Sequence, residues 1–398
     1  MDFYKVKANE TGSRLFVADD MFLTRDLPTT AGSKMLQGYM SLFNAQVLDT
    51  LKESGFTLSG KSKVGEFAID LMGETDFEGT LAKDGILLDA SCEIVKAGQA
   101  EFTIVDDVNG SPRRAAAQSG LINLKPTYGT VSRFGIIGTA SSGETVGITA
   151  KMAKTAKEVL SVISGHDDKD GTSLPEDSCK KVMEEGKSMR VAVLENFLDS
   201  CDDEVKAKIE RAKALLEKEG VTVDFVSDEV IFASRIAWNI LMSAETCNNV
   251  SRFDGVKYGY RTNSFTNIDE LYTKSRTEAF GDLIKTCILF GSETLSTDNY
   301  MPVYDKALRL RRKVCEAFAS LFAKYDAILL PATSKMAYTV EEVKANKELA
   351  YEENLFTAPA SITGLPALTA GGVQFIAGAF QEGKLFDIAE KLEKEAEV

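Results

Sequence analysis

Histidine is almost absent from this chain: 398 residues contain one, His166, in the segment SGHDDKDG. A Ser-His-Asp triad would have to use this residue, and a metal site built from several histidines is excluded. His166 follows an apolar helical pattern and a glycine and lies among aspartates, which is typical of a loop. If the protein is a hydrolase, we expect its base to be a lysine, an aspartate or a glutamate. We expect no metal and no cofactor.

Paired cysteines and long apolar runs are also missing. The six cysteines show no CxxC spacing, which is typical of reduced thiols in a cytoplasm rather than of a disulfide framework. The N-terminal segment MDFYKVKANE has no apolar stretch of signal-peptide length, and no segment reaches the length of a membrane span. We therefore expect a cytoplasmic protein that does not associate with a membrane.

Positive charge is in deficit. Lysine and arginine number 46 against 60 aspartates and glutamates, which gives a formal net charge of −14 at pH 7. A protein that grips a phosphate backbone needs clustered lysines and arginines. The chain has one local basic run, Arg309, Arg311, Arg312 and Lys313. We expect no direct binding of nucleic acid by this chain alone.

What the sequence does contain is an alternation of strand and helix patterns. We find no internal repeat, low-complexity tract or Pro- or Ser-rich linker, so we expect one domain spanning residues 1–398. The predicted strands are residues 14–18, 56–58, 190–194, 221–226 and 327–330, and the predicted helices are residues 46–54, 151–164, 203–219 and 304–324. This alternation predicts an α/β fold.

The segment DDVNGSPRRAAAQSG, residues 106–120, has two interpretations. With Ser111 as N-cap, Pro112 at the first helical position and Gly120 after the last turn, it fits the rules for a short helix. Alternatively, Ser111 is the nucleophile of a hydrolase whose loop has departed from its usual pattern. The local pattern alone favours the cap, so the rest of the chain has to decide.

Longer motifs connect the chain to a known family. They are KPTYGTVSRFG (125–135), ASS (140–142), TTAGSKML (29–36), GKSKVGEFAID (60–70), SRFDGVKYGYRT (251–262), FTAPASITGLPAL (356–368) and GGVQFIAGAF (371–380). Together they resemble the amidase signature family, and most closely its glutamine-hydrolysing amidotransferase members, over about residues 15–385. The resemblance implies the amidase-signature fold, a mixed β-sheet flanked by helices on both faces. The family's usual N-terminal helical segment is expected to be absent.

The resemblance assigns the nucleophile position. Enzymes of this family cleave an amide with a serine nucleophile, a lysine base, and a second serine that relays the proton. Against the family pattern D-T-G-G-S, the chain carries Ser111 at the nucleophile position. The oxyanion positions are Val108, Asn109 and Gly110, and Asn109 replaces a glycine. Because a side chain restricts how closely the backbone approaches a ligand, this replacement counts against an oxyanion hole.

The base and relay positions have changed more. The lysine position of the family is Asp19, and a carboxylate with an ordinary pKa near 4 is a weak base for a serine. The relay position is Leu87, which can neither accept nor donate a proton. Lys61 and Ser91 are candidate substitutes for the lost groups, and each also has an ordinary structural interpretation.

The expected substrate pocket departs in the same way. Cys287 stands where the family has the arginine that binds the substrate carboxylate, and Asn354 stands where it has the aspartate that meets the substrate ammonium. A thiol cannot offer the two parallel hydrogen bonds of a guanidinium. Arg311 is a candidate replacement, although a solvated helix face shared with Arg309 and Arg312 explains it better.

Two functional hypotheses follow. In the first, the chain keeps the fold, is catalytically impaired, and acts as a binding or structural subunit with amidotransferase partner subunits or a small amide ligand. In the second, it is a working amidase or amidotransferase subunit that uses Ser111 with a rewired base. Ser111 favours the second hypothesis. The altered positions favour the first: Asp19, Leu87, Asn109, Cys287 and Asn354.

Overall fold

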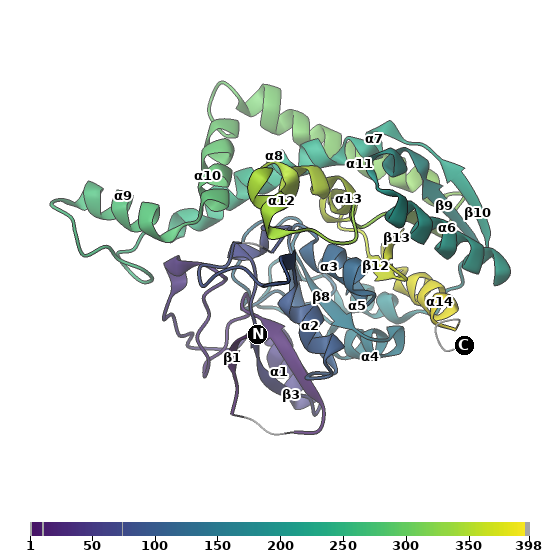
Figure 1. Ribbon diagram of the computed structural model, residues 1–398, viewed down its shortest axis with the longest axis horizontal. Coiled ribbons are helices and arrows are strands. Elements are labelled where there is room, and N and C mark those ends of the chain that lie inside the picture. The colour runs from purple at the N-terminus through teal and green to yellow at the C-terminus, as the bar shows by residue number, and fades with distance from the viewer. Residues whose placement is uncertain (1, 10–11, 74, 395–398) are drawn as a thin grey trace.

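The computed structural model describes residues 2–9, 12–73 and 75–394. One sheet of eleven strands runs through this part of the chain, in the order β1-β3-β2-β6-β8-β7-β12-β13-β11-β9-β10 (Figure 1). Its parallel pairs lie in two groups, β3-β2-β6 and β11-β9-β10, and antiparallel pairs join them. The sheet is therefore mixed, and the predicted α/β class is confirmed.

The strands of the main sheet are β1 (Tyr4–Lys7), β2 (Leu15–Asp19), β3 (Thr57–Ser62), β6 (Phe102–Asp107), β7 (Ile122–Lys125), β8 (Thr145–Ala150), β9 (Arg190–Leu194), β10 (Thr222–Val226), β11 (Ala327–Leu330), β12 (Ala367–Ala370) and β13 (Val373–Ala377). A separate pair is formed by β4 (Ala82–Lys83) and β5 (Ile86–Leu87).

The α-helices are α1 (Gln46–Glu53), α2 (Ala90–Lys96), α3 (Ser111–Ser119), α4 (Ala153–Ile163), α5 (Glu176–Cys179), α6 (Asp203–Lys218), α7 (Glu229–Phe232), α8 (Ser234–Asn249), α9 (Ile268–Ala279), α10 (Asp282–Thr294), α11 (Lys306–Phe322), α12 (Val340–Ala345), α13 (Leu349–Thr363) and α14 (Glu382–Glu393). Shorter helical turns are η1 (Lys34–Leu36), η2 (Glu66–Ala68), η3 (Lys180–Met183), η4 (Glu195–Ser200), η5 (Val250–Arg252) and η6 (Tyr300–Asp305).

The predicted elements all form, with shifted ends. The strands predicted at 190–194 and 327–330 coincide with β9 and β11, whereas β3 extends four residues beyond the prediction, to Ser62. The predicted helix at 304–324 is α11, which begins at Lys306 because η6 precedes it. Helix ends fray and the last turn often tightens, so shifts of one or two residues carry no further meaning.

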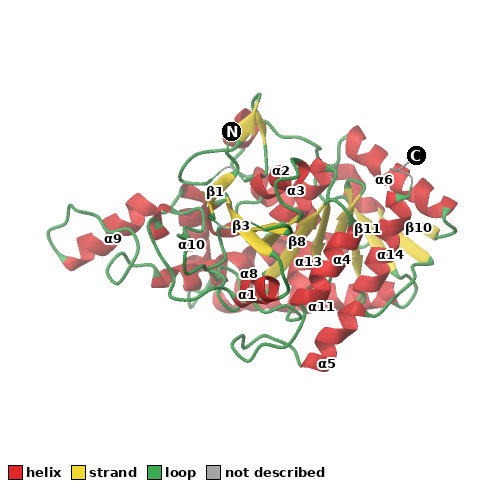
Figure 2. Cartoon of the chain, turned by 90° about the horizontal axis from the view of Figure 1, so that it is seen from below, coloured by secondary structure: helices red, strands yellow, loops and turns green. Residues whose placement is uncertain are grey.

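Consecutive residues of β2 show how the sheet is covered on both faces. Side chains alternate along a strand, so Phe16 and Val17 point to opposite faces. Phe16 belongs to the main core together with Leu48 of α1, whereas Val17 packs with Ile94 of α2. Figure 2 shows helices on both sides of the strands. The two apolar faces of the sheet are therefore buried by different helices, as the resemblance implies.

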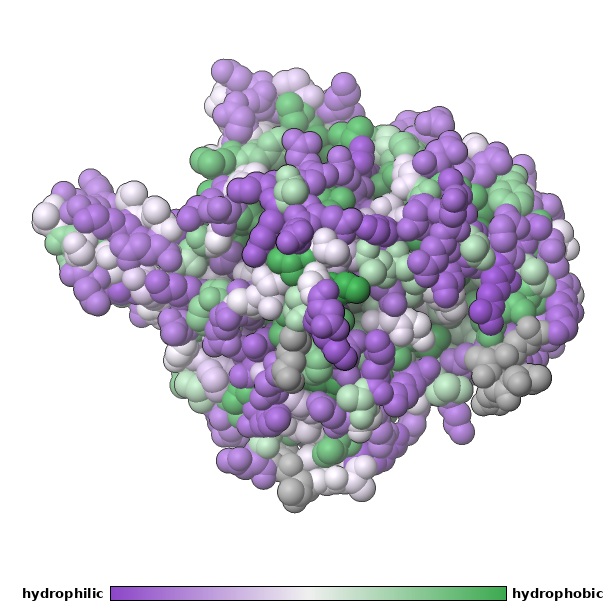
Figure 3. Space-filling model, viewed as in Figure 1, coloured by the Kyte–Doolittle hydropathy of each residue, from purple (hydrophilic) through white to green (hydrophobic). Residues whose placement is uncertain are grey.

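The face of the molecule in Figure 3 is mostly polar. Hydrophilic side chains cover much of the face in Figure 3, including the segment around α9 that projects from the body (Figure 1). Among the exposed apolar side chains, Ile236 of α8, Leu289 of α10 and Met301 of η6 are more than half exposed. No helix in the described ranges is both long enough and apolar enough to cross a membrane.

Candidate functional site

Ser111 lies at the first residue of α3, directly after β6 and a tight turn. Gly110 takes the N-cap position with φ of 87°, and a Cβ there would lie 2.3 Å from Cβ of Thr357, so the turn requires glycine. The interpretation of Ser111 as the N-cap is therefore wrong, because the turn needs a left-handed residue at that position. Within the described residues the Ser111 hydroxyl has no hydrogen-bond partner, and it borders a cavity.

A buried ion pair between Asp107 and Arg113 fixes the turn that precedes Ser111. The Arg113 guanidinium donates to the Asp107 carboxylate through Nε (2.7 Å) and Nη2 (3.1 Å), and both side chains are fully buried. Its remaining N–H groups bond Gln374, Ser361 and the main-chain oxygen of Thr357. Such bidentate pairs are strong and directional. The position of Ser111 relative to the sheet is therefore rigid.

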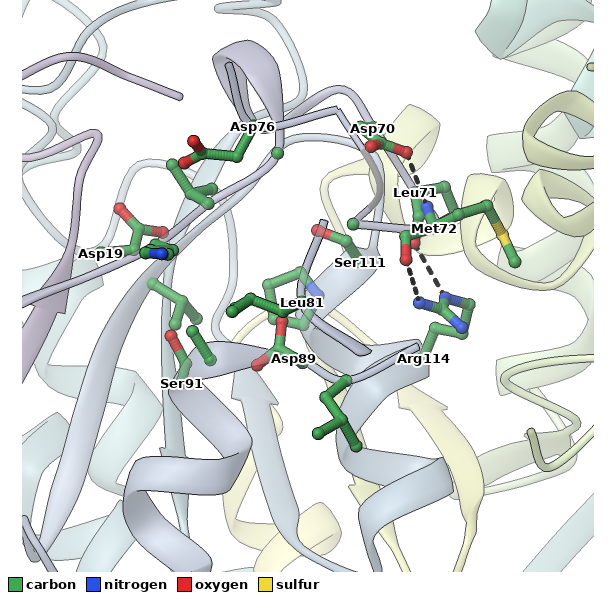
Figure 4. Close-up of a pocket in the computed structure, with 18 of the residues that line it drawn as sticks. Asp19, Asp70, Leu71, Met72, Asp76, Leu81, Asp89, Ser91, Ser111 and Arg114 are labelled. Carbon is green, nitrogen blue, oxygen red and sulfur yellow. Dashed lines mark hydrogen bonds between the residues drawn. The ribbon is translucent and has the colours of Figure 1, made fainter. Parts of the chain in front are cut away.

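The cavity beside Ser111 brings three of the predicted positions together. Asp19 and Ser91 lie on one side of the view in Figure 4, Arg114 lies on the other, and Ser111 lies between them. The other charged residues of the lining are Lys63, Asp70, Asp76, Asp89 and Asp106. Its volume of about 40 Å³, counted as space open to the centre of a water molecule, holds about three waters. A typical small-molecule site is larger, roughly 300–1,000 Å³.

Asp19, at the family's lysine position, is held at the end of β2 by backbone amides. Its Oδ1 accepts from the amide of Met21 (3.0 Å), and its Oδ2 accepts from the amide of Asp106 (2.7 Å). Burial raises the pKa of Asp19 to about 7, and the two amide hydrogen bonds only partly offset this. The expectation of an ordinary pKa near 4 is therefore wrong, because that value applies to a solvated carboxyl.

Lys61 lies outside this cavity lining, and its ammonium is saturated. It donates to Oδ1 of Asp20 (3.0 Å), to the main-chain oxygen of Pro28 (3.0 Å) and to Oγ1 of Thr29 (2.6 Å). An ammonium has three donors, and all three are used. Burial lowers the pKa of Lys61, while the charge of Asp20 opposes that shift. These contacts hold the Lys61 ammonium against Asp20, Pro28 and Thr29.

Leu87 and Ser91 lie in different surroundings. Leu87, in β5, packs against an apolar cluster that contains Met72, Tyr338 and Val343, and it is not part of the cavity lining. Ser91 is part of the lining, and its Oγ lies 2.8 Å from Oγ of Ser62. The structure thus places the candidate substitute Ser91, but not Leu87, beside the cavity.

Asn109 fills space on another side of the turn. Its Oδ1 accepts from Nε1 of Trp238 (2.8 Å) and from Nδ2 of Asn354 (2.6 Å), and its Nδ2 donates to the main-chain oxygen of Ile69 (3.1 Å). The main-chain oxygen of Asn109 accepts from Nδ2 of Asn354 and from Oγ1 of Thr357. The side chain at an oxyanion position is therefore committed to internal contacts.

The remaining predicted pocket residues, Cys287 and Arg311, also make contacts within the chain. Cys287 is fully buried, burial raises the pKa of its thiol to about 11, and its Sγ lies 3.7 Å from Oη of Tyr351. Arg311 donates to the main-chain oxygen (3.2 Å) and to Oγ (3.3 Å) of Ser142. Neither residue borders the cavity beside Ser111.

Several residues of the site are not identified by the sequence analysis. Asp89 is the N-cap of α2 and accepts from the amide of Cys92 (2.8 Å), a role that the pattern DASCEIVK could have indicated. Arg114 donates to the main-chain oxygens of Leu71 and Met72. Trp238 has no local signal, because it meets Asn109 from 129 positions away.

The fold and this arrangement define the class of protein. The cavity beside the turn between β6 and α3, which carries Ser111, is also lined by residues of β2 and α2, and a sequence model of the amidase family matches residues 91–386. The chain belongs to this family, the amidase signature family.

Its relatives include known amidotransferase subunits. The chain is 33% identical over 394 residues to the A subunit of glutamyl-tRNA(Gln) amidotransferase from Lactobacillus acidophilus, and the match covers 94% of this chain and 82% of that protein. It is 34% identical over 403 residues to the corresponding protein of Streptococcus pneumoniae, with 96% and 82% covered.

Solved structures agree. The crystal structure of the A subunit of glutamyl-tRNA(Gln) amidotransferase from Thermotoga maritima superposes with a TM-score of 0.82 at 28% identity, over 98% of this chain and 87% of that one. A 6-aminohexanoate cyclic dimer hydrolase shares the fold, with a TM-score of 0.81 at 19% identity over 96% and 85% of the two chains.

Proposed function

We propose that this chain is a catalytically impaired member of the amidase signature family that acts by binding, in a structural or ligand-binding role in the cytoplasm. The observation that carries the proposal is the isolation of the Ser111 hydroxyl, which has no hydrogen-bonded proton acceptor in the described part of the chain. A serine is a weak nucleophile until an adjacent base takes its proton. Loss of positioned proton transfer typically costs about 100-fold to 10,000-fold in rate.

The residues at the base and relay positions support the same conclusion. Both carboxylate oxygens of Asp19 already accept backbone amides, and Leu87 packs into an apolar cluster. The candidate substitute Lys61 uses its three donors on Asp20, Pro28 and Thr29. The side chains at the base and relay positions, and the candidate substitute Lys61, therefore make contacts that stabilise the fold, and none of them is placed to take the proton of Ser111.

The alternative is a working amidase that uses Ser111 with a rewired base, and one observation favours it. Burial raises the pKa of Asp19 to about 7, which is close to the value that suits a general base at neutral pH. Asp19 also borders the same cavity as Ser111. Its two amide hydrogen bonds count against this role, because they stabilise the anion and so oppose its protonation.

Partners are part of the proposal. The relatives named above are subunits of an amidotransferase, so we propose that this chain also works with partner subunits. The exposed apolar side chains of α8, α10 and η6 agree with a contact of this kind.

The test is labelling with a serine-directed fluorophosphonate, followed by mass spectrometry of the Ser111 peptide. We expect slow or no labelling of the natural protein, and the same result for the Ser111→Ala variant. Glutaminase and general amidase activity, measured with and without copurifying partners, should be absent. Rapid labelling that Ser111→Ala abolishes would show an activated nucleophile and favour the alternative.

A further inference from the structure

The side-chain amide of Asn109 is bonded at both ends by groups from three separate segments. Trp238 of α8 and Asn354 of α13 donate to its Oδ1 at 2.8 and 2.6 Å, and the main-chain oxygen of Ile69 accepts from its Nδ2 at 3.1 Å. Asn109 is 3%, Trp238 1% and Asn354 0% exposed. These contacts form a closed set around one planar amide, without water access.

This set is complementary to one chemical class. Two N–H donors face the carbonyl oxygen and a carbonyl acceptor faces the NH2 group, which is the pattern that a primary carboxamide satisfies. A carboxylate would place an oxygen against the carbonyl of Ile69, and a tertiary amide has no N–H to donate. Among the described residues Nδ2 of Asn109 donates to the Ile69 carbonyl alone, and the buried Oδ1 of Asn354 has no hydrogen-bond partner.

We propose that Asn109 is an internal ligand: its carboxamide occupies a primary-amide recognition site formed by Trp238, Asn354 and the Ile69 carbonyl, and closes that site to external amides. The inference goes beyond the proposed function, because it assigns a ligand class and does not depend on whether Ser111 is activated.

Truncation of the Asn109 side chain should leave the amide site empty, so that binding of an external amide can be measured. We would compare the natural protein with Asn109→Ala and Asn109→Gly, and would use acetamide as the probe. The chain has one tryptophan, so the indole N–H of Trp238 gives one resonance in a ¹⁵N-labelled sample. In the variants this resonance should shift on addition of acetamide and saturate on the order of 1–10 mM, as expected for so small a ligand. In the natural protein it should not shift.

Two chemical controls and one variant sharpen the result. N,N-dimethylacetamide and acetate should leave the resonance of both variants in place, because neither can donate to the Ile69 carbonyl. Asn109→Asp keeps the volume of the side chain, so it should not respond to acetamide. A response to dimethylacetamide equal to that to acetamide, or an equal shift in the natural protein, would overturn the proposal.

A measurement on the natural protein covers the case in which the variants do not fold. The indole N–H of Trp238 is bonded to Asn109 and 1% exposed, so its exchange with deuterium should be slow, close to that of the core amides. Rapid exchange of this proton would contradict the internal-ligand arrangement. Slow exchange together with acetamide binding by a folded variant supports it, whatever the outcome of Ser111 labelling.

Discussion

The ammonium of Lys61 lies 3.0 Å from Oδ1 of Asp20, and neither side chain is more than 1% exposed. Asp20 also accepts from the amide of Thr30 (2.9 Å), so this pair ties β2 and β3 to the segment that carries the motif TTAGSKML. A buried pair of this kind makes each partner depend on the other, because either charge alone would be buried without compensation.

Replacement of Lys61 by methionine should therefore be strongly destabilising. We expect the Lys61→Met variant to lose about 3–5 kcal/mol in its free energy of unfolding, because the Asp20 charge stays buried. Lys63→Met is the matched control, two residues further on, where the side chain borders the cavity and is partly exposed. We expect that variant to lose less than about 1 kcal/mol. Urea denaturation of both proteins measures the difference, and equal losses would show that the ion pair is not the cause.

The reactivity of Ser111 should not follow the ionisation of Asp19. Burial raises the pKa of Asp19 to about 7, so a carboxylate acting as base would switch labelling on as the pH rises through 7. The proposed function predicts that the labelling rate does not step up between pH 6 and pH 8. It also predicts equal fluorophosphonate labelling rates for the natural protein and Asp19→Asn. A step near pH 7 that is lost in Asp19→Asn would instead identify Asp19 as the rewired base.

Stability should fall as the pH rises from about 5 to 7. Burial raises the pKa of Glu66 from 4.5 to about 7 in the folded protein, and that of Asp19 from 3.8 to about 7. Between the unfolded and folded values the folded state binds more protons. The stability that these groups contribute is therefore complete below about pH 4 and is lost as the pH rises through 7.

The variant Glu66→Gln isolates one of these contributions. We expect its stability to depend less steeply on pH than that of the natural protein, by about 1–3 kcal/mol between pH 5 and 7. Burial lowers the pKa of Lys125 from 10.5 to about 7, so that group begins to act in the opposite direction as the pH approaches 7. Urea denaturation of both proteins at pH 5, 6 and 7 measures the difference between them, in which the contributions of Lys125 and His166 cancel. Unchanged steepness in Glu66→Gln would contradict the assignment.

The sequence predicts the scaffold well and the site less well. The apolar runs of β9 and β11 and the amphipathic repeat of α6 are visible in the sequence. They predict these elements correctly because each pattern involves only residues that are close together in the chain. The cap assigned to Ser111 fails although its residues fit the rule, because the position of Gly110 against Thr357 of α13 decides where the helix starts. That contact is between residues far apart in the sequence.

The chemistry of the site depends on burial in the same way. The sequence shows that Asp19 replaces a lysine, but its raised pKa comes from the surrounding protein, which no local pattern records. It shows that Asn109 replaces a glycine, but not that Trp238 and Asn354 bind its amide. The resemblance locates the altered positions, and the structure supplies what the new side chains do.

Nucleic acid should bind weakly to the isolated chain. With a net charge of −14, few phosphate contacts are available, and binding to nucleic acid depends on such contacts. We expect a dissociation constant for tRNA weaker than about 10 μM near physiological salt, which is within the range of non-specific binding. Filter binding at two salt concentrations measures it. Tight binding that weakens steeply with salt would show a basic surface that the net charge conceals.

The final prediction concerns restoration of the family residues at the base and relay positions. The double variant Asp19→Lys with Leu87→Ser supplies the residue types that the family uses, yet we expect Ser111 labelling to stay slow. Leu87 packs with Met72, Tyr338 and Val343 and is not part of the cavity lining, so we expect a hydroxyl placed there to lie outside the cavity that Ser111 borders.

The Asp19→Lys substitution should itself lower the free energy of unfolding. Lysine has no acceptor for the amides of Met21 and Asp106, which Asp19 now satisfies, and a buried unpaired amide costs about 1–3 kcal/mol. We therefore expect the double variant to be less stable than the natural protein by about 2–6 kcal/mol, as two such amides imply. Its labelling rate at Ser111, compared with that of Leu87→Ser alone, is the measurement. Fast labelling of the folded double variant would mean that the chain around β5 can rearrange to bring residue 87 to Ser111, and it would contradict this prediction.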